Sequence, residues 1–161
     1  MAKTSYAIGL GSNRRHGRHG APARVLTAAL DALGELGEVE DVSTIRSTPA
    51  LGPAGRGFAI AVALLRTRLE PDELLDALKR IERDFGRRGG RRWGPRVLDL
   101  DIILWSEGPW DGPGPLVPHA EFRNRDFVLA PLAEVAADWR DPISGASVRQ
   151  LRFRLRRPRS G

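Results

Sequence analysis

The sequence contains no cysteine, so it can form neither disulfides nor thiolate metal sites. It also lacks an uninterrupted apolar run of about 20 residues, the length that a membrane-spanning helix needs. The N-terminal stretch MAKTSYAIGLGSN has neither the apolar core nor the cleavage site of a signal peptide. We therefore expect a cytoplasmic protein without a membrane partner.

Lysine is nearly absent, since Lys3 and Lys79 are the only two lysines among 26 basic residues and the others are arginines. Arginine stays charged and forms bidentate contacts with phosphate and carboxylate groups. A compositional bias of the genome would explain the total, but it does not explain the clustering. Residues 79–96 hold eight basic residues against two acidic ones, a net +6 that equals the net charge of the whole chain.

No linker or internal repeat divides the 161 residues. A chain of this length buries a sizeable core without covalent cross-links, so we expect a single domain over residues 1–161. Residues 150–161 are strongly basic, and we expect them to form a partly disordered tail.

The hydrophobic pattern predicts an α+β fold. Apolar runs and helical periodicities alternate in the order strand, helix, strand, strand, helix, strand, which matches the split β-α-β arrangement of ferredoxin-like folds. We expect a ferredoxin-like α/β sandwich, with a mostly antiparallel sheet, helices packed on it, and mobile glycine- and arginine-rich loops. The expected strands are residues 6–11, 38–47, 58–67 and 97–105, and the expected helices are residues 23–36, 70–85 and 126–138.

Two carboxylates interrupt the last of these apolar runs. Alternate side chains of a strand share a face, so Asp99 and Asp101 stand together, roughly 6–7 Å apart along the strand. Like charges at that separation repel unless a positive group lies beside them. Mg²⁺ would fill that role, because it prefers carboxylate, phosphate and water oxygens. The alternative is a solvated sheet face on which each aspartate pairs with an arginine.

The segment before the aspartates favours phosphate chemistry. Its arginines could clamp polyphosphate oxygens, its glycines would let it move as a lid, and Trp93 could cover a base or a sugar. Carboxylates, arginines and a mobile cover together suggest phosphoryl-type transfer. No lysine follows a glycine, so the usual P-loop is absent, and Gly9 and Gly11 lack the third glycine of a dinucleotide-binding fingerprint.

Two longer motifs include these residues or follow them, namely WGPRVLDLDIILW at residues 93–105 and VPHAEFRNRDFVLAPLAEVA at residues 117–136, and IGLGSN and STPALGP lie upstream. By these motifs the chain resembles a known family, the 6-hydroxymethyl-7,8-dihydropterin pyrophosphokinases of folate biosynthesis. The resemblance implies the transfer of pyrophosphate from ATP to the hydroxymethyl group of a reduced pterin, with release of AMP. It also implies two Mg²⁺ ions that bridge the ATP phosphates to Asp99 and Asp101.

The resemblance assigns roles by position. The implied catalytic residues are Arg87, Arg92, Trp93, Arg96, Asp99 and Asp101. The implied ATP-binding residues are Glu82, Arg87, Arg92, Trp93, Arg96, Ile102, His119 and Arg125. The implied pterin-binding residues are Thr48, Pro49, Leu51, Phe58 and Phe127, the two phenylalanines sandwiching the ring. Taken alone, His119 could equally be a surface histidine, and the two phenylalanines could be plain core residues.

The chain departs from the family at Ile60, where family members usually carry an asparagine that reads the pterin ring. Isoleucine makes no hydrogen bond, and an unmet polar edge in a buried site costs roughly 1–3 kcal/mol. Either backbone groups read the pterin alone, or the acceptor differs, or the residue is altered in this chain. Ala120 stands where an aromatic residue is often found, and the catalytic loop is about one residue shorter than in some relatives.

Two further expectations concern partners. The basic tail LRFRLRRPR suggests a nucleic-acid-binding module as a competing hypothesis, because basic surfaces bind phosphate backbones. The sequence carries no RNP-like, zinc-finger or helix-turn-helix signature, so ATP and a reduced pterin are favoured over nucleic acid. We expect a monomer.

Overall fold

The computed structural model describes residues 2–12, 21–48, 58–87 and 97–157. The glycine- and arginine-rich loops that were expected to be mobile fall largely at residues 13–20 and 88–96, outside these ranges. The elements are β1 (Thr4–Ser12), α1 (Pro22–Gly34), β2 (Glu38–Val42), β3 (Arg46–Thr48), β4 (Phe58–Thr67), α2 (Pro71–Arg87), β5 (Asp99–Trp105), a short 3₁₀ helix (Phe122–Asn124), α3 (Asp126–Ala136) and α4 (Val148–Arg156).

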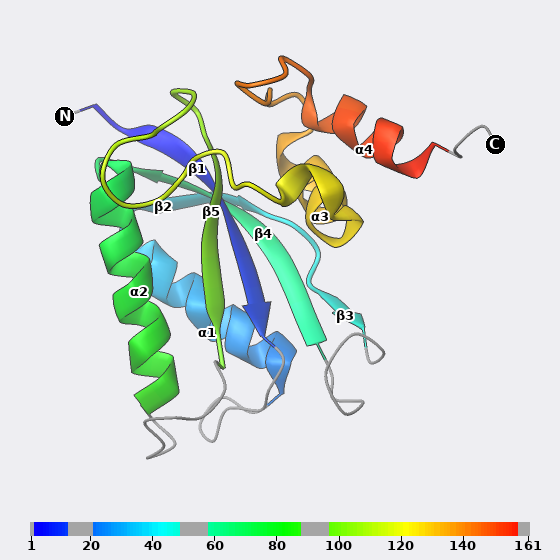
Figure 1. The fold of residues 1–161 in the computed structure, drawn as a ribbon. Helices are drawn as coiled ribbons and strands as arrows, with labels where there is room; N and C mark the ends of the chain where they lie inside the picture. The colour runs from blue at the N-terminus through cyan, green and yellow to red at the C-terminus, as the bar shows by residue number, and fades with distance from the viewer. Residues whose placement is uncertain (1, 13–20, 49–57, 88–96, 158–161) are drawn as a thin grey trace.

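The strands form one antiparallel sheet in the order β2-β4-β1-β5, and β3 also pairs with β4 (Figure 1). β1 and β4 lie in its centre, and β5 forms one edge. The strand expected at residues 38–47 forms two short strands, β2 and β3, and both pair with β4. This arrangement confirms the predicted α+β fold with a mostly antiparallel sheet.

Helices cover both faces of the sheet (Figure 1). Because side chains alternate along β4, Ala61, Ala63 and Leu65 enter a core with α1 and α2, whereas Val62 and Leu64 enter a second core with α3 and α4. The small alanines on the first face let the two long helices approach the sheet. The opposite face carries the second core at one end, and its other end carries the candidate site.

Helix α2 begins as the sequence predicts. Pro71 is its first residue, and Asp72 and Glu73 lie in its first turn, where negative charge interacts favourably with the helix dipole. The buried residues Leu74 and Leu78 lie one turn apart and pack into the first core. This places the C-terminal half of α2 beside the edge strand β5.

In the basic C-terminal segment, residues 148–156 form helix α4, and residues 158–161 of the expected tail lie outside the described residues. The Ser147 side chain accepts a hydrogen bond from the Gln150 backbone N–H, and the Gln150 side chain accepts one from the Ser147 backbone N–H. This capping box satisfies two N-terminal donors. Only Val148 and Leu151 are buried, so the helix has too few apolar positions for periodicity to reveal it.

A buried ion pair ties this C-terminal region to the 3₁₀ helix. The Arg123 Nη2 atom donates to Asp141 Oδ1 at 2.7 Å, and the Nε atom donates to Oδ2. The backbone N–H of Ile143 and the Ser144 hydroxyl also donate to the same carboxylate, which is fully buried.

Among the residues that the structure describes, no helix is long and apolar enough to cross a membrane.

Candidate functional site

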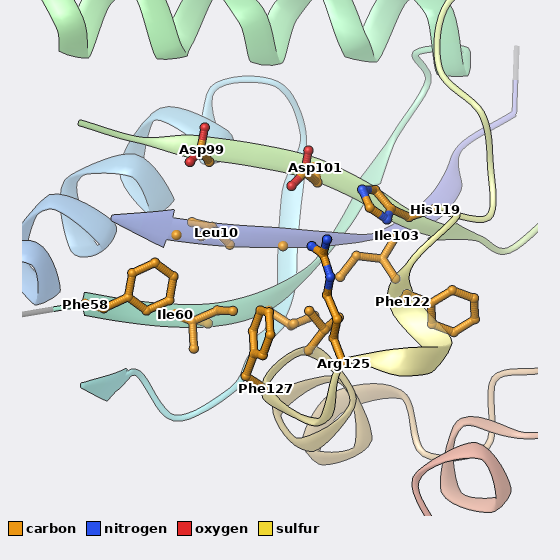
Figure 2. A pocket seen from close by; sticks show the side chains of 15 residues that line it. Leu10, Phe58, Ile60, Asp99, Asp101, Ile103, His119, Phe122, Arg125 and Phe127 are labelled. Atoms are coloured by element: carbon orange, nitrogen blue, oxygen red, sulfur yellow. The ribbon is translucent and has the colours of Figure 1, made fainter. Parts of the chain in front are cut away.

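A pocket of about 160 Å³ lies on the α3 side of the sheet (Figure 2). Strands β1, β4 and β5 supply its floor, and the segment after β5 and the start of α3 supply its wall. It brings together six of the predicted site residues from four parts of the chain, namely Phe58, Asp99, Asp101, His119, Arg125 and Phe127.

Asp99 and Asp101 occupy the face of β5 that the alternation predicted. Both are exposed and extend from the same side of the strand into the pocket (Figure 2), whereas Leu98 and Leu100 are buried in the first core. Two carboxylates on an accessible face suit Mg²⁺, which takes one or two protein carboxylates and completes its shell with phosphate and water oxygens. The described residues hold no cluster of three or more potential metal ligands, so a bound ion would need such substrate oxygens.

Glycines on β1 leave room above the floor. Gly9 pairs with Asp101 and Gly11 pairs with Asp99, and both glycines line the pocket. A Cβ atom at Gly9 would lie 3.1 Å from the Ile103 Cδ1 atom, so a side chain there would crowd the floor. The sequence pointed to these glycines through the IGLGSN motif and through the missing dinucleotide fingerprint, but not as part of a pocket floor. Because these glycines alternate with buried residues of β1, the sequence could have predicted that they lie on the opposite face of the strand.

Glu82 lies on α2 next to the edge strand and does not line the pocket. Its Oε2 atom accepts a hydrogen bond of 2.8 Å from the backbone N–H of Leu100, the residue between the two aspartates. Its Oε1 atom accepts a hydrogen bond from the Lys79 ammonium group at 3.3 Å. The side chain is 11% exposed, so the contact is shielded from water. The carboxylate thus holds the outer edge of β5 where the aspartates project.

We expect Glu82→Ala to lower the free energy of unfolding by about 1–3 kcal/mol, because the Leu100 N–H would lose its partner in a shielded position. Urea denaturation checks this value. Glu82→Gln is the matched control, since an amide oxygen can still accept that hydrogen bond. Equal stability of the alanine variant and the wild type would contradict the role assigned to this contact.

His119 is oriented by two backbone contacts. Its own N–H donates to the Ile103 carbonyl at 3.0 Å, and its Nδ1 atom accepts a hydrogen bond of 3.2 Å from the backbone N–H of Glu121. A neutral imidazole that accepts at Nδ1 carries its proton on Nε2. The imidazole therefore has a donor available at Nε2, and it lines the pocket near Asp101 (Figure 2).

Two aromatic rings line the opposite part of the pocket. Figure 2 shows Phe58 and Phe127 on either side of Ile60. Phe127 is 42% exposed, so it is not a plain core residue. The guanidinium carbon of Arg125 lies 5.8 Å from the centre of the Phe127 ring, within cation–π distance. Cationic and aromatic groups thus meet at the rim.

The remaining predicted residues lie elsewhere. Ile102 is buried in the first core on the other face of β5, so its side chain does not line the pocket. Thr48 ends β3 and Arg87 ends α2, and their side chains are not described. Five predicted residues fall outside the described ranges, namely Pro49, Leu51, Arg92, Trp93 and Arg96.

Sequence reasoning missed the apolar end of the pocket. Val62, Ile103, Phe122 and Val128 line it alongside the predicted residues. Three of them belong to strands or helices whose apolar residues read as ordinary core. Phe122 follows the Val-Pro-His segment, but nothing in its local sequence distinguishes a pocket wall from a buried anchor.

Residues 7–137 match the family described as 7,8-dihydro-6-hydroxymethylpterin-pyrophosphokinase. A protein of Pseudomonas aeruginosa named 2-amino-4-hydroxy-6-hydroxymethyldihydropteridine pyrophosphokinase is 45% identical over 138 residues, which cover 84% of this chain and 82% of that protein. The protein of the same name from Haemophilus influenzae is 42% identical over 139 residues, with the same coverage of both chains. A Synechocystis protein of that name is 43% identical over 102 residues, and the alignment spans about half (52%) of its length.

A solved structure of Plasmodium falciparum HPPK-DHPS with pteroate superposes with a TM-score of 0.68. The match covers 94% of this chain and 42% of that longer chain, at 10% sequence identity. A likeness at so low an identity concerns the fold alone, and it agrees with the ferredoxin-like arrangement predicted from the sequence.

Proposed function

Because this chain belongs to the 7,8-dihydro-6-hydroxymethylpterin-pyrophosphokinase family, we propose that its pocket transfers pyrophosphate from ATP to the hydroxymethyl group of 6-hydroxymethyl-7,8-dihydropterin. The family match confirms the predicted resemblance and the predicted enzyme class, an ATP-dependent pyrophosphokinase. The observation that carries the proposal for this site is the convergence of two carboxylates and two aromatic rings in one pocket. Phosphate chemistry needs the first pair, and a flat heterocycle fits the second.

The acceptor ring would lie between Phe58 and Phe127. Aromatic pairs stack at ring-centre distances of about 4.5–7 Å, and stacking orients a flat ring without consuming its polar edge. Asp99 and Asp101 line the other part of the same floor. A ring held between the phenylalanines would therefore direct its hydroxymethyl group toward the carboxylates, which favours the reaction through orientation alone.

Asp99 and Asp101 would hold two Mg²⁺ ions together with the ATP phosphates. Bound Mg²⁺ neutralises charge that develops on phosphoryl oxygens. The protein itself would fix both carboxylates on one face of β5. The contact between Glu82 and the Leu100 N–H restrains this strand. Glu82 would thus act on the nucleotide site through the strand.

Donors at the rim would hold the triphosphate. The His119 Nε2 atom and the Arg125 guanidinium group lie on the wall beside the aspartates, and both can donate to phosphate oxygens. The implied roles of Arg87, Arg92, Trp93 and Arg96 in covering ATP and stabilising developing charge remain part of this proposal. The hydroxymethyl oxygen would form a bond to the β-phosphorus and lose its proton, while the bond between the β-phosphorus and the bridging α–β oxygen breaks and AMP leaves.

The direct test is AMP release from ATP and Mg²⁺ with and without 6-hydroxymethyl-7,8-dihydropterin. We expect AMP only when the pterin is present, and we expect EDTA to abolish it. ATP binding without pterin-dependent AMP would overturn the proposed acceptor. AMP formation that persists in EDTA would overturn the role given to the carboxylates.

We propose that the enzyme acts as a monomer, the state expected from the sequence. Light scattering after size-exclusion chromatography at working concentration tests this state. A stable dimer that is more active than the monomer would contradict it. The cytoplasmic location expected from the sequence stays a prediction.

A further inference from the structure

A second pocket, of about 660 Å³, lies on helices α3 and α4, which pack against each other (Figure 1). We call it the α3–α4 groove. It shares no described lining residue with the pocket of the proposed function. Ala133 and Ala137, one turn apart at the end of α3, line one side of it. Because an alanine side chain is a single methyl group, this side leaves room for a side chain of another molecule.

Helix α4 turns a stripe of arginines toward the groove. Arg149, Arg152 and Arg156 line it at the spacing i, i+3 and i+7, which is one face of a helix, and Phe153 lies among them. The rise of about 1.5 Å per residue separates Arg149 from Arg156 by roughly 10 Å along the helix. Phe153 is 70% exposed. The groove thus presents positive charge on both sides of an exposed aromatic ring.

Arg152 has an unused donor. Its Nε atom is buried, and no described group accepts a hydrogen bond from it. The Oδ1 atom of Asp126 lies 3.7 Å from that atom, which is beyond hydrogen-bonding distance. The Arg152 side chain as a whole is 31% exposed, so an acceptor that enters the groove can reach the guanidinium group. A further acceptor would be favourable there, because a buried donor without a partner is costly.

The charges around the groove indicate which kind of polyanion fits it. Four arginines line it, and Asp126 and Asp138 pair with two of them, so these described residues carry a net charge of +2. A nucleic acid carries a phosphate at every nucleotide and would bring several of them against the two aspartates, whereas its affinity depends on the number of phosphates neutralised. A polypeptide can place carboxylates only where the arginines lie. It can also supply an apolar side chain for Phe153, and arginine and aromatic residues are enriched at the centres of protein interfaces.

We propose that the α3–α4 groove binds an amphipathic helical segment of a partner protein, in which two carboxylates about two turns apart flank an aliphatic side chain. Carboxylates at i and i+7 lie on one helix face roughly 10 Å apart, the separation of Arg149 and Arg156. Arginine forms paired hydrogen bonds with such carboxylates. The aliphatic side chain would pack on Phe153 and the two alanines, as in other complexes of a helix in a groove. The inference goes beyond the proposed function and does not depend on it.

The test uses a synthetic helical peptide as the probe. The peptide has about 20 residues, because shorter helices are marginal in water, and carries the motif EAAALAAE at the centre of an alanine- and glutamine-rich sequence. Fluorescence anisotropy of the labelled peptide at low salt measures binding to the full-length protein. We expect a dissociation constant below about 1 mM. A peptide with glutamine in place of both glutamates should bind about tenfold more weakly, since hydrogen bonds to charged groups are lost. A peptide with serine in place of the leucine should also bind more weakly.

Variants of the protein locate the binding. We expect the double variant Arg149→Gln and Arg156→Gln to weaken binding of the glutamate peptide by about tenfold or more. Phe153→Ser should weaken it as well. Arg154→Gln is the matched control, because Arg154 is exposed on the same helix and does not line the groove, so its affinity should stay within about twofold of the wild type. The urea midpoint of each variant should equal that of the wild type, which shows that the protein remains folded.

Four results would overturn the inference. The first is absence of binding of the glutamate peptide to the wild type. The second is an equal loss of affinity in Arg154→Gln and in the double variant, which would show attraction by net charge alone. The third is a single-stranded oligonucleotide that binds more tightly than the peptide and responds to the same variants, because the groove would then belong to a nucleic acid. The fourth is a wild-type dimer in light scattering that the double variant dissociates, because a second copy of the chain would then occupy the groove.

Discussion

Asp99→Asn and Asp101→Asn are each expected to lower kcat by about three powers of ten. A metal ion that neutralises phosphoryl charge is worth several kcal/mol in the transition state, and each 1.36 kcal/mol corresponds to a factor of ten. Asparagine keeps the size of the side chain but removes the charge that draws the ion. The measurement is pterin-dependent AMP release at saturating ATP over a range of Mg²⁺ concentrations, where we also expect a higher Mg²⁺ requirement.

These substitutions separate chemistry from folding, because both aspartates are exposed on the pocket face of an edge strand. Substitutions at such positions usually change stability by no more than about 0.5 kcal/mol. Asp111→Asn is a matched control, since Asp111 is also exposed and does not line the pocket. Activity that survives at both Asp99→Asn and Asp101→Asn would refute the metal-binding role of this pair.

The two-faced character of β5 could be predicted because it depends only on the period of a strand. Leu98 and Leu100 alternate with Asp99 and Asp101, and any extended conformation places the two sets on opposite faces. The same reasoning predicted β4, whose bounds Phe58–Thr67 coincide with the expected run. Local pattern is sufficient where one face is buried and the other is not.

The floor of the pocket could not be predicted in that way. Asp99, Gly11 and Ile60 lie side by side on β5, β1 and β4. This arrangement depends on the register of three strands that are far apart in the sequence. A shift of one residue would move each of these side chains to the other face. Register follows from packing of the whole sheet, so the sequence distinguishes Ile60 only through the family resemblance, and the place of Ile60 beside Gly11 is a property of the folded sheet.

Helix α4 illustrates a different limit. Its stability comes from a capping box and from packing on α3, and its exposed residues are three arginines together with Gln150, Phe153 and Leu155. High positive charge and few apolar residues are typical of disordered segments. Tertiary contacts made by Val148 and Leu151 outweigh that composition. Charge alone therefore does not reveal the helix at residues 148–156.

The largest stability effect is expected at Asp141. Asp141→Asn removes the charge and one acceptor oxygen of the bidentate contact with Arg123, whose side chain is 28% exposed while that of Asp141 is fully buried. Removing one partner of a fully buried pair typically costs about 3–5 kcal/mol, and the partial exposure of Arg123 places this pair near the lower end of that range. We expect a loss of that size in the free energy of unfolding by urea at pH 7. Asp138→Asn is the matched control, because the pair of Asp138 with Arg149 is exposed and should contribute less than about 1 kcal/mol.

The pH dependence gives a second measurement of the same contact. The hydrogen bond from Arg123, followed by those from the Ile143 N–H and the Ser144 hydroxyl, lowers the pKa of Asp141 well below its usual range despite burial. A carboxyl group whose pKa is lower in the folded state stabilises the protein above its unfolded pKa of about 3.9, and that stabilisation is lost as the pH falls through the folded pKa. The stability difference between the wild type and Asp141→Asn should therefore be constant above about pH 5 and should narrow below about pH 4. A difference that stays unchanged down to about pH 2 would show that the carboxylate charge of Asp141 does not contribute to the stability of this fold.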